Sequence, residues 1–398
     1  MKKINKNIIV FALVAIFILS GVASKNMMLV IGRNFYHLIK GESSVSEFIS
    51  GVESTSVKDL NYYNFLNDLN SLRLNVLNNC ILQKEDDLVV KMENGYLTNA
   101  ASYVDDDSIK DCVKNIQLLQ SVCESNNSKF LYVLAPDKDY YGTYPQGLEN
   151  YSKSNINRFI SCLDDSGINY LNLIDKMDED GLSWEDSFFI TDHHWTPKTG
   201  FWANRKICER LNQDFDFQYN ESYTDIDNYE IKTYKDWFLG SSGKKVGKYF
   251  TELGVDDIDL ITPLFETNLT EEQPLKNLVK TGDFENTVIY TENIYKKDYY
   301  SLNAYAAYHG GDFRQQIVTN NLIKSDVKIL VIRDSYACVV TPFLSLQAKE
   351  THIVDVRNYS YYYGDKPNMK DYIEAENPDY VIVLYKACPT VDNRTDFF

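Results

Sequence analysis

The sequence predicts an α/β fold in which helices cover both faces of a mostly parallel β-sheet. Short apolar runs with the length and composition of buried strands occur at 130–135, 168–174, 327–332, 353–356 and 380–384. Stretches of helical character lie at 111–124, 155–163 and 198–211. Buried strands that alternate with helices are typical of parallel sheets, because the crossover helices cover both faces.

The length and composition are those of a globular protein. A chain of 398 residues with 44% hydrophobic and 24% charged residues can bury a sizeable core. It has room for two or three domains, or for one α/β domain with insertions. This composition excludes global disorder, a collagen-like fibre and a protein with many membrane spans. The formal net charge is −17 and no long Lys/Arg run stands out, so we expect no nucleic-acid partner.

The first residues have the pattern of an export or anchoring signal. Lys2, Lys3 and Lys6 precede an almost wholly apolar stretch at 8–23, so we assign residues 1–31 to a signal peptide or signal-anchor helix. The stretch is short for a membrane span and its cleavage site is poor, which leaves a retained anchor and a cleaved signal both open. We expect a single-pass N-terminal anchor in the cell membrane with an extracytoplasmic domain, or a secreted protein.

The rest of the chain divides into two parts by its sequence pattern. Residues 32–109 are polar, with few helix breakers and with leucines near helical spacing in 61–82, and we interpret them as a helical stalk or cap. Residues 110–398 carry the strand and helix pattern. Between about 213 and 300 that pattern is lost, and we expect an irregular, β-containing insertion there.

Seven cysteines occur, and none forms a C-x-x-C pair. The spacing excludes a zinc knuckle and a thioredoxin-like motif, and the length excludes a dense disulfide scaffold. We expect most of the thiols to be buried, and one or two disulfides stay open. We expect no cofactor and no bound metal.

Two histidines stand beside an aspartate in a loop before the helix that starts near Pro197. On an extended backbone, Asp192 and His194 point the same way, so that the carboxylate can hold the imidazole in one tautomer, while His193 faces away. The alternative is structural: Asp192 caps the helix and Trp195 packs in the core.

A serine follows the buried strand at 327–332. Ser335 lies where a strand ends and a turn or helix begins, and backbone N–H groups at such a place can stabilise an oxyanion. It is the best-placed nucleophile in the chain. A serine in this position is also a common helix cap, which is the alternative interpretation.

The Asp-His-His-Trp segment followed by a late strand and Asp-Ser-Tyr resembles the bacterial DHHW protein family, which is related to the alginate O-acetylation proteins with SGNH hydrolase-like domains. The resemblance covers roughly residues 110–390. Its further motifs are Ala-Pro-Asp-Lys at 135–138 with Tyr-Pro at 144–145, Gly-Ser-Ser-Gly-Lys-Lys-Val-Gly at 240–247, Tyr-His-Gly-Gly-Asp at 308–312, Pro-Phe-Leu at 342–344 and Asp-Val-Arg at 355–357. It implies a three-layer α/β/α fold, flavodoxin-like and circularly permuted.

By this resemblance Ser335 is a nucleophile, His194 its base and Asp192 the orienting acid. The aspartate and histidine precede the serine, as the permuted fold requires. Two departures stand out: Arg333 replaces the usual glycine, and Asp312 and Cys338 stand where relatives often carry asparagine. An anionic Asp312 would oppose an oxyanion. The candidates for oxyanion or substrate contacts are Asp334, Tyr336, Gly311, Asp312, Lys138, Arg357 and Trp195.

Several of these residues also have ordinary structural interpretations. Lys138 and Arg357 could be solvated surface charges. His309 fits an exposed turn better than a site residue. The tyrosines of the C-terminal region could form a platform for sugars or belong to the core; they are Tyr359, Tyr361, Tyr362 and Tyr363.

The resemblance implies an extracytoplasmic carbohydrate O-acetyltransferase or acetylesterase. Its substrate would be a cell-surface or secreted polysaccharide or a cell-wall glycan, and a membrane-bound O-acyltransferase would be the acetyl source. One alternative is a non-catalytic glycan-binding or assembly protein with the same fold. Another is a metal-dependent phosphoesterase that uses Asp192, His193 and His194 as ligands, although no further Asp/His cluster supports it.

Overall fold

The computed structural model describes residues 63–84, 87–357, 367–388 and 394–398, together with a few isolated positions between 29 and 44. The predicted signal or anchor segment and the tyrosines at 359–363 lie outside these residues. The chain divides into two compact units, Met1–Leu77 and Asn78–Phe398. In the part of the chain that is described, no helix has both the length and the apolar character needed to cross a membrane.

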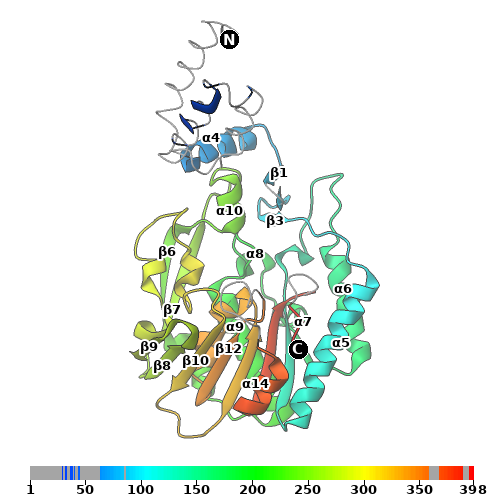
Figure 1. Cartoon of the computed structure of the whole chain (residues 1–398), viewed down its shortest axis with the longest axis vertical. Helices are drawn as coiled ribbons and strands as arrows, with labels where there is room; N and C mark the ends of the chain where they lie inside the picture. The colour runs from blue at the N-terminus through cyan, green and yellow to red at the C-terminus, as the bar shows by residue number, and fades with distance from the viewer. Residues whose placement is uncertain are drawn as a thin grey trace, which may run out of the picture. The chain divides into compact units, whose positions relative to one another are not determined.

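An eight-stranded mixed sheet forms the centre of the second unit (Figure 1). The strand order is β5-β4-β13-β11-β12-β10-β8-β9. The first five strands in this order are parallel, and the last three continue the sheet antiparallel. The strands are β4 (Lys129–Ala135), β5 (Tyr170–Asn172), β8 (Leu269–Gln273), β9 (Leu278–Gly282), β10 (Gln315–Asn320), β11 (Lys328–Arg333), β12 (Glu350–Val354) and β13 (Tyr380–Lys386).

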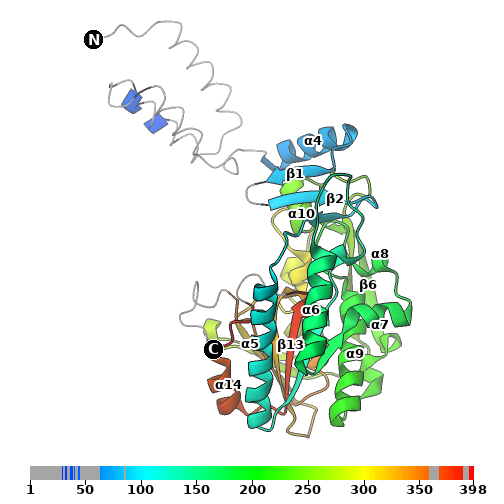
Figure 2. The same ribbon diagram turned by 90° about the vertical axis from the view of Figure 1, so that its right-hand side faces the viewer.

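Two hydrophobic cores flank the sheet and give three layers. Alternate residues of β11 point to opposite faces: Ile329 and Val331 belong to one core, and Leu330 and Ile332 to the other. The first core contains α7 (Leu173–Asp180) and α9 (Pro197–Phe215). The second contains α5 (Asp106–Ser125), α6 (Ser152–Ser166) and α14 (Met369–Glu376). In Figure 2, α5 and α6 are seen in front of β13, and α14 is at the lower left. The predicted α/β fold is therefore confirmed.

The predicted strand at 168–174 is shorter than expected. Only Tyr170–Asn172 is extended, because the side chain of Asn172 accepts a hydrogen bond from the N–H of Ile174 and begins α7. The apolar residues Leu173 and Ile174 are buried in the first turn of that helix instead.

The helical character expected of residues 32–109 is wrong for 81–99, where the chain forms strands. Helix α4 (Tyr63–Val76) is followed by Asn78 in the left-handed region, with φ of 55°. A three-stranded antiparallel sheet comes next, with β1 (Ile81–Lys84), β2 (Asp87–Lys91) and β3 (Leu97–Asn99). The β-branched pair Val89 and Val90, both fully buried, favours a strand over a helix there.

The stretch at 213–300 contains strands, and they belong to two sheets. β6 (Tyr229–Phe238) and β7 (Asp256–Pro263) form a separate antiparallel pair, whereas β8 and β9 extend the main sheet. None of the seven cysteines, all of which lie in the described part of the chain, forms a disulfide bond. The remaining short helices are α8 (Trp184–Ser187), α10 (Ser241–Val246), α11 (Phe284–Val288) and α12 (Thr341–Leu344).

Helix α9 lies directly against the 3₁₀ turn η8 (Ser335–Val339), which follows β11. A Cβ atom on Gly200 of α9 would lie 2.6 Å from the carbonyl oxygen of Val339, closer than atoms normally approach. The glycine therefore allows the helix to approach the backbone of the turn.

We predict that Gly200→Ala destabilises the protein by about 1–3 kcal/mol, because the methyl group overpacks against backbone that cannot move aside. Denaturant unfolding measures the effect. The control is Gln213→Ala, at an exposed position of the same helix, with an expected change within about 0.5 kcal/mol. Equal unfolding midpoints for Gly200→Ala and Gln213→Ala would show that α9 does not pack tightly against Val339.

Candidate active site

Ser335 stands at the carboxyl end of β11, and Asp334 shapes the turn that carries it. One carboxylate oxygen of Asp334 accepts the N–H of Tyr336 at 3.0 Å. The other accepts the N–H of Lys386 at 2.9 Å and Nη1 of Arg394 at 2.6 Å. Asp334 was a candidate for substrate contact. It is 1% exposed and holds the strand-to-turn corner in place.

The predicted Asp192, His194 and Ser335 converge in the structure. Nδ1 of His194 lies 2.5 Å from Oδ1 of Asp192, and Nε2 lies 2.7 Å from Oγ of Ser335, across 141 positions of sequence. The alternative in which Asp192 caps α9 does not hold, because Thr196 is the cap and accepts the N–H of Thr199. The three side chains have the geometry of a nucleophile, a base and an orienting acid.

Asp192 is buried and ionised. Burial alone would raise its pKa, but the two adjacent histidines and the hydrogen bonds it accepts outweigh burial and lower the pKa well below the usual range. Its second oxygen accepts the N–H of Ser241 at 2.6 Å. An ionised carboxylate against Nδ1 places the proton on that nitrogen and leaves Nε2 to accept the proton of the serine.

His193 does not face away, contrary to the expectation from an extended backbone. The loop bends at these residues, and the ring centroids of His193 and His194 lie 3.9 Å apart. Nδ1 of His193 lies 3.1 Å from Oγ of Ser241. His193 lines a pocket of about 190 Å³ together with Thr98, Asn99, Asp334, Ser335, Tyr336, Lys386 and Arg394.

A buried cation and a buried anion hold the loop that carries Asp192. Nζ of Lys138 donates to the carbonyl oxygens of Phe189, Ile190 and Asp192, at 2.9, 3.3 and 2.5 Å. Asp256 of β7 accepts the N–H of Ile190, and the N–H and hydroxyl of the next residue, Thr191. Burial lowers the pKa of Lys138 to about 8 and raises that of Asp256 to about 6. Lys138, expected as a substrate contact, is 2% exposed and uses its donors on the loop.

Aromatic side chains surround the histidine. The ring of Tyr305 is stacked on His194, with centroids 4.2 Å apart, and its hydroxyl donates to the carbonyl of Ser335 at 3.0 Å. Nε1 of Trp195 donates to the carbonyl of Tyr336 at 2.9 Å, and the hydroxyl of Tyr336 donates to the carbonyl of His193 at 2.7 Å. Trp195 and Tyr336 are thus buried supports of the site, and Tyr336 also lines the pocket.

Asp312 is neutralised, which corrects the expectation that it opposes an oxyanion. Its carboxylate lies 2.9 Å from Nη1 of Arg333 and 3.3 Å from Nη2 of Arg357. Burial opposes its ionisation, but the two guanidinium groups outweigh burial and lower its pKa. Arg333 also donates to the carbonyl of Gly311 at 2.9 Å, and Arg357 forms a bidentate pair with Asp355. The departures at 312 and 333 therefore compensate each other.

His309 is buried, although an exposed turn was expected. It is 1% exposed, and its Nδ1 lies 3.6 Å from the buried Oε1 of Glu271. The backbone at His309 is left-handed, with φ of 54°, and its carbonyl accepts Nε2 of Gln316 at 2.9 Å. These backbone contacts turn the side chain inward.

Two groups in the described part of the chain have the spacing of metal ligands. One is Asp192, His193 and His194, where both ring nitrogens of His194 are already engaged by the carboxylate and the serine. The other is Glu350, His352 and Glu376, where Nζ of Lys328 lies 3.6 and 3.1 Å from the two glutamates and occupies the place of a cation. In both groups, ligand atoms already have hydrogen-bond or ion-pair partners within the protein.

Sequence reasoning missed several residues of the site. Asp256 and Tyr305 lie far in the sequence from the Asp-His-His-Trp and Asp-Ser-Tyr motifs, although Tyr305 precedes the motif at 308–312 by three residues. Thr98 and Asn99 come from β3, in a region expected to be helical. Lys386 carried a usable signal, because it ends a buried parallel strand at the same sheet edge as Ser335.

Comparisons with known proteins give structural likeness only. No family model and no curated protein matches the chain. Bacillus cereus PatB1, in a structure with a sulfonyl adduct, matches with a TM-score of 0.64 and 19% identity over 79% of this chain and 99% of that one. A DHHW family protein from Eubacterium siraeum matches with a TM-score of 0.58 and 17% identity, over 79% and 95%. The resemblance to the DHHW family is thereby confirmed at the level of the fold.

A third match is more distant. The O-acetyltransferase domain of Pseudomonas putida AlgJ has a TM-score of 0.46 and 11% identity, over 76% of this chain and 91% of that domain. A likeness this weak carries no inference about the chemistry of this chain.

We predict a pH dependence of stability from Asp256. Its pKa is higher in the folded chain, about 6, than in an ordinary aspartate, so the folded chain binds the additional proton between roughly pH 4 and 6. The quantity to measure is the difference in unfolding free energy between the parental chain and Asp256→Asn. As pH rises through this window, this difference should fall by up to about 3 kcal/mol in disfavour of the parental chain, and it should then level off. A difference that stays constant from pH 4 to 7 would contradict it.

Proposed function

We propose that this protein transfers or hydrolyses acetyl esters on an extracytoplasmic polysaccharide. The observation that carries the proposal is the continuous hydrogen-bonded chain from Asp192 through His194 to Ser335. The likeness in fold to a DHHW family protein and to PatB1 supports it.

In the first half of the reaction, Oγ of Ser335 attacks the acetyl carbonyl while Nε2 of His194 takes the serine proton. The imidazolium is stabilised by the ionised Asp192. The imidazolium then returns the proton to the departing oxygen, and the acetyl group is left on the serine.

In the second half, a hydroxyl group attacks the acetyl-serine and His194 takes its proton. A sugar hydroxyl completes O-acetyltransfer, and water completes hydrolysis. The two outcomes share the same residues and differ in whether the bound acceptor excludes water. The pocket beside Ser335 offers the polar residues Thr98, Asn99 and Lys386 to such an acceptor.

The two alternatives are less well supported by the geometry. A protein that only binds glycans does not need a base 2.7 Å from a serine hydroxyl. Nor does it need the buried Lys138 and Asp256 that hold the loop of that base. A phosphoesterase that uses Asp192, His193 and His194 as metal ligands would have to break one of the two hydrogen bonds of His194, because the metal needs one of its ring nitrogens.

We predict that Ser335→Ala or His194→Ala lowers the turnover of an acetyl ester by on the order of 10³-fold or more. The double variant should lose little more than either single variant, because the groups act as a unit, and Asp192→Asn should lose somewhat less. Acetate release from p-nitrophenyl acetate or an acetylated glycan measures it. Ser125→Ala, at an exposed helix end, is the control. Undiminished turnover by Ser335→Ala would refute nucleophilic catalysis.

We further propose that the N-terminal segment places this domain outside the cytoplasm, where a membrane-bound O-acyltransferase delivers the acetyl group. The proposal rests on Lys2, Lys3 and Lys6 before the apolar stretch. Protease added to intact cells, with the outer envelope layer permeabilised where one exists, should therefore degrade residues 110–390 but spare a cytoplasmic marker. Full protection of this region, with degradation only after lysis, would place the chemistry inside the cell.

A further inference from the structure

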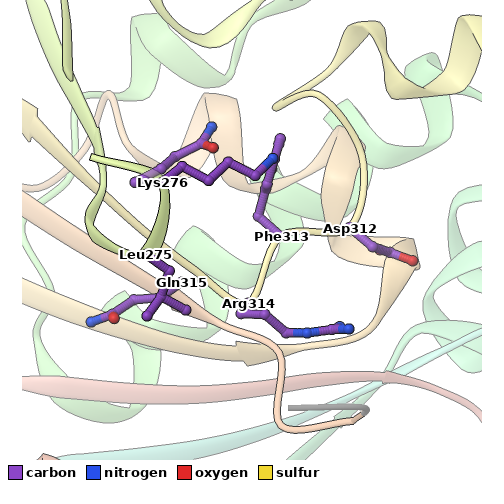
Figure 3. A pocket seen from close by; sticks show the side chains of 7 residues that line it. Leu275, Lys276, Asp312, Phe313, Arg314 and Gln315 are labelled. Carbon is purple, nitrogen blue, oxygen red and sulfur yellow. The ribbon is translucent and has the colours of Figure 1, made fainter. Parts of the chain in front are cut away.

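A second pocket lies at the same edge of the sheet as Ser335. It has a volume of about 210 Å³, and Figure 3 shows the side chain of Lys276 extending to Phe313, both of which line it. Gln315, which lines it, pairs with Val354 at the carboxyl end of β12, and β12 runs parallel to β11. The strand order β11-β12-β10-β8 and a spacing of about 4.8 Å between neighbours put the pocket roughly 10–15 Å from the end of β11. A polysaccharide spans this distance and an acetyl group does not.

The pocket has a cationic mouth. Nζ of Lys276 lies 3.7 Å from the centroid of the Phe313 ring, which holds the ammonium group in place. No carboxylate of the described residues forms an ion pair with it. Arg314 adds a second positive charge to the lining. Glu271, which is buried behind the lining, is the acidic group that acts on Lys276, so the two cations at the pocket face one carboxylate that has no cation of its own in the lining. In a chain with a net charge of −17, such a cationic lining favours an anionic ligand.

The one acidic residue in the lining does not cancel this charge. Asp312 is paired with Arg333 and Arg357, and Arg357 is in turn paired with Asp355. These four groups are neutral as a set. The negative charge of Asp312 is therefore already compensated from the side of the catalytic serine.

A buried amide in the lining also lacks a partner. Gln273 is 1% exposed, and its Oε1 has no hydrogen-bond partner among the described residues, although its Nε2 donates to the hydroxyl of Tyr290. A buried acceptor without a donor is costly. A hydroxyl group of a bound sugar would supply that donor.

We propose that this pocket is a subsite for an acidic sugar of the polysaccharide that is acetylated or deacetylated at Ser335. Lys276 and Arg314 bind the carboxylate or phosphate, and Gln273 accepts a hydroxyl. The inference rests on the proposed function for the identity of the chain that reaches both places. It adds that the polysaccharide is anionic.

Binding to the full chain with Ser335→Ala tests the subsite without turnover. The probes are polygalacturonate, poly(glycerol phosphate) and neutral dextran, each titrated at low ionic strength. Lys276→Gln should weaken binding of one polyanion about tenfold, and Lys276→Arg should keep it within about twofold. The matched control is Lys129→Gln, the same charge change at the opposite edge of the sheet, which should leave binding unchanged.

The outcomes separate the subsite from the proposed function. Binding of polygalacturonate alone assigns a carboxylate sugar, and binding of poly(glycerol phosphate) alone assigns a phosphate. No polyanion binding, equal binding of dextran, or equal effects of Lys276→Gln and Lys129→Gln would overturn the subsite. Hydrolysis of p-nitrophenyl acetate by the parental chain tests the proposed function separately, since that ester has no acidic sugar. If the parental chain did not hydrolyse this ester but still bound a polyanion through Lys276, the proposed function would be contradicted and the anion subsite would stand.

Discussion

The hydrogen bond between Nε2 of His194 and Oγ of Ser335 is the constraint on which the rest of the site depends. It joins the end of a buried parallel strand to a loop far away in the sequence, so both backbones must be held to within a few tenths of an ångström. On the serine side, the carboxylate of Asp334 fixes the turn through three donors. On the histidine side, Lys138 binds carbonyl oxygens of the loop and Asp256 binds its N–H groups. The chemistry needs only three side chains, but the geometry needs the surrounding fold.

Much of the fold and the three central residues of the site could be predicted from the sequence. Buried strands are continuous apolar runs, and the ends of parallel strands share one edge, which is why Ser335 stood out. The contacts of Lys138 and Asp256 with the Asp192 loop could not be predicted. Asp256 lies in β7, which pairs with β6 over a long sequence distance and without a local pattern. The extended conformation assumed for the Asp192 loop also failed, since the loop bends and brings His193 into the pocket. Short-range signals therefore predicted which three residues come together at the site and not which residues position them.

The altered motif positions show why single substitutions are weak evidence of lost activity. Asp312 in place of asparagine, taken alone, places a negative charge near a developing oxyanion. Arg333 in place of glycine, taken alone, buries a cation in the corner before the serine. Together they form an ion pair at 2.9 Å that Arg357 extends. Arg333 is buried, so removal of Asp312 would leave its guanidinium group with less compensation, whereas the half-exposed Asp312 is also solvated. The pair keeps the electrostatics next to Ser335 close to neutral.

Lys138 and Asp256, which bind the loop that carries Asp192, position the site more than they stabilise the fold. Lys138 and Asp256 are both buried, and burial works against both charges, as the opposite directions of their pKa changes show. A pair of apolar residues of similar volume would avoid that desolvation and would often be as stable. Apolar residues cannot bind the carbonyl and N–H groups of a bent loop one by one, whereas an ammonium group and a carboxylate can. Selection for stability alone gives no reason to keep such a pair, but the need to fix Asp192 and His194 opposite Ser335 does.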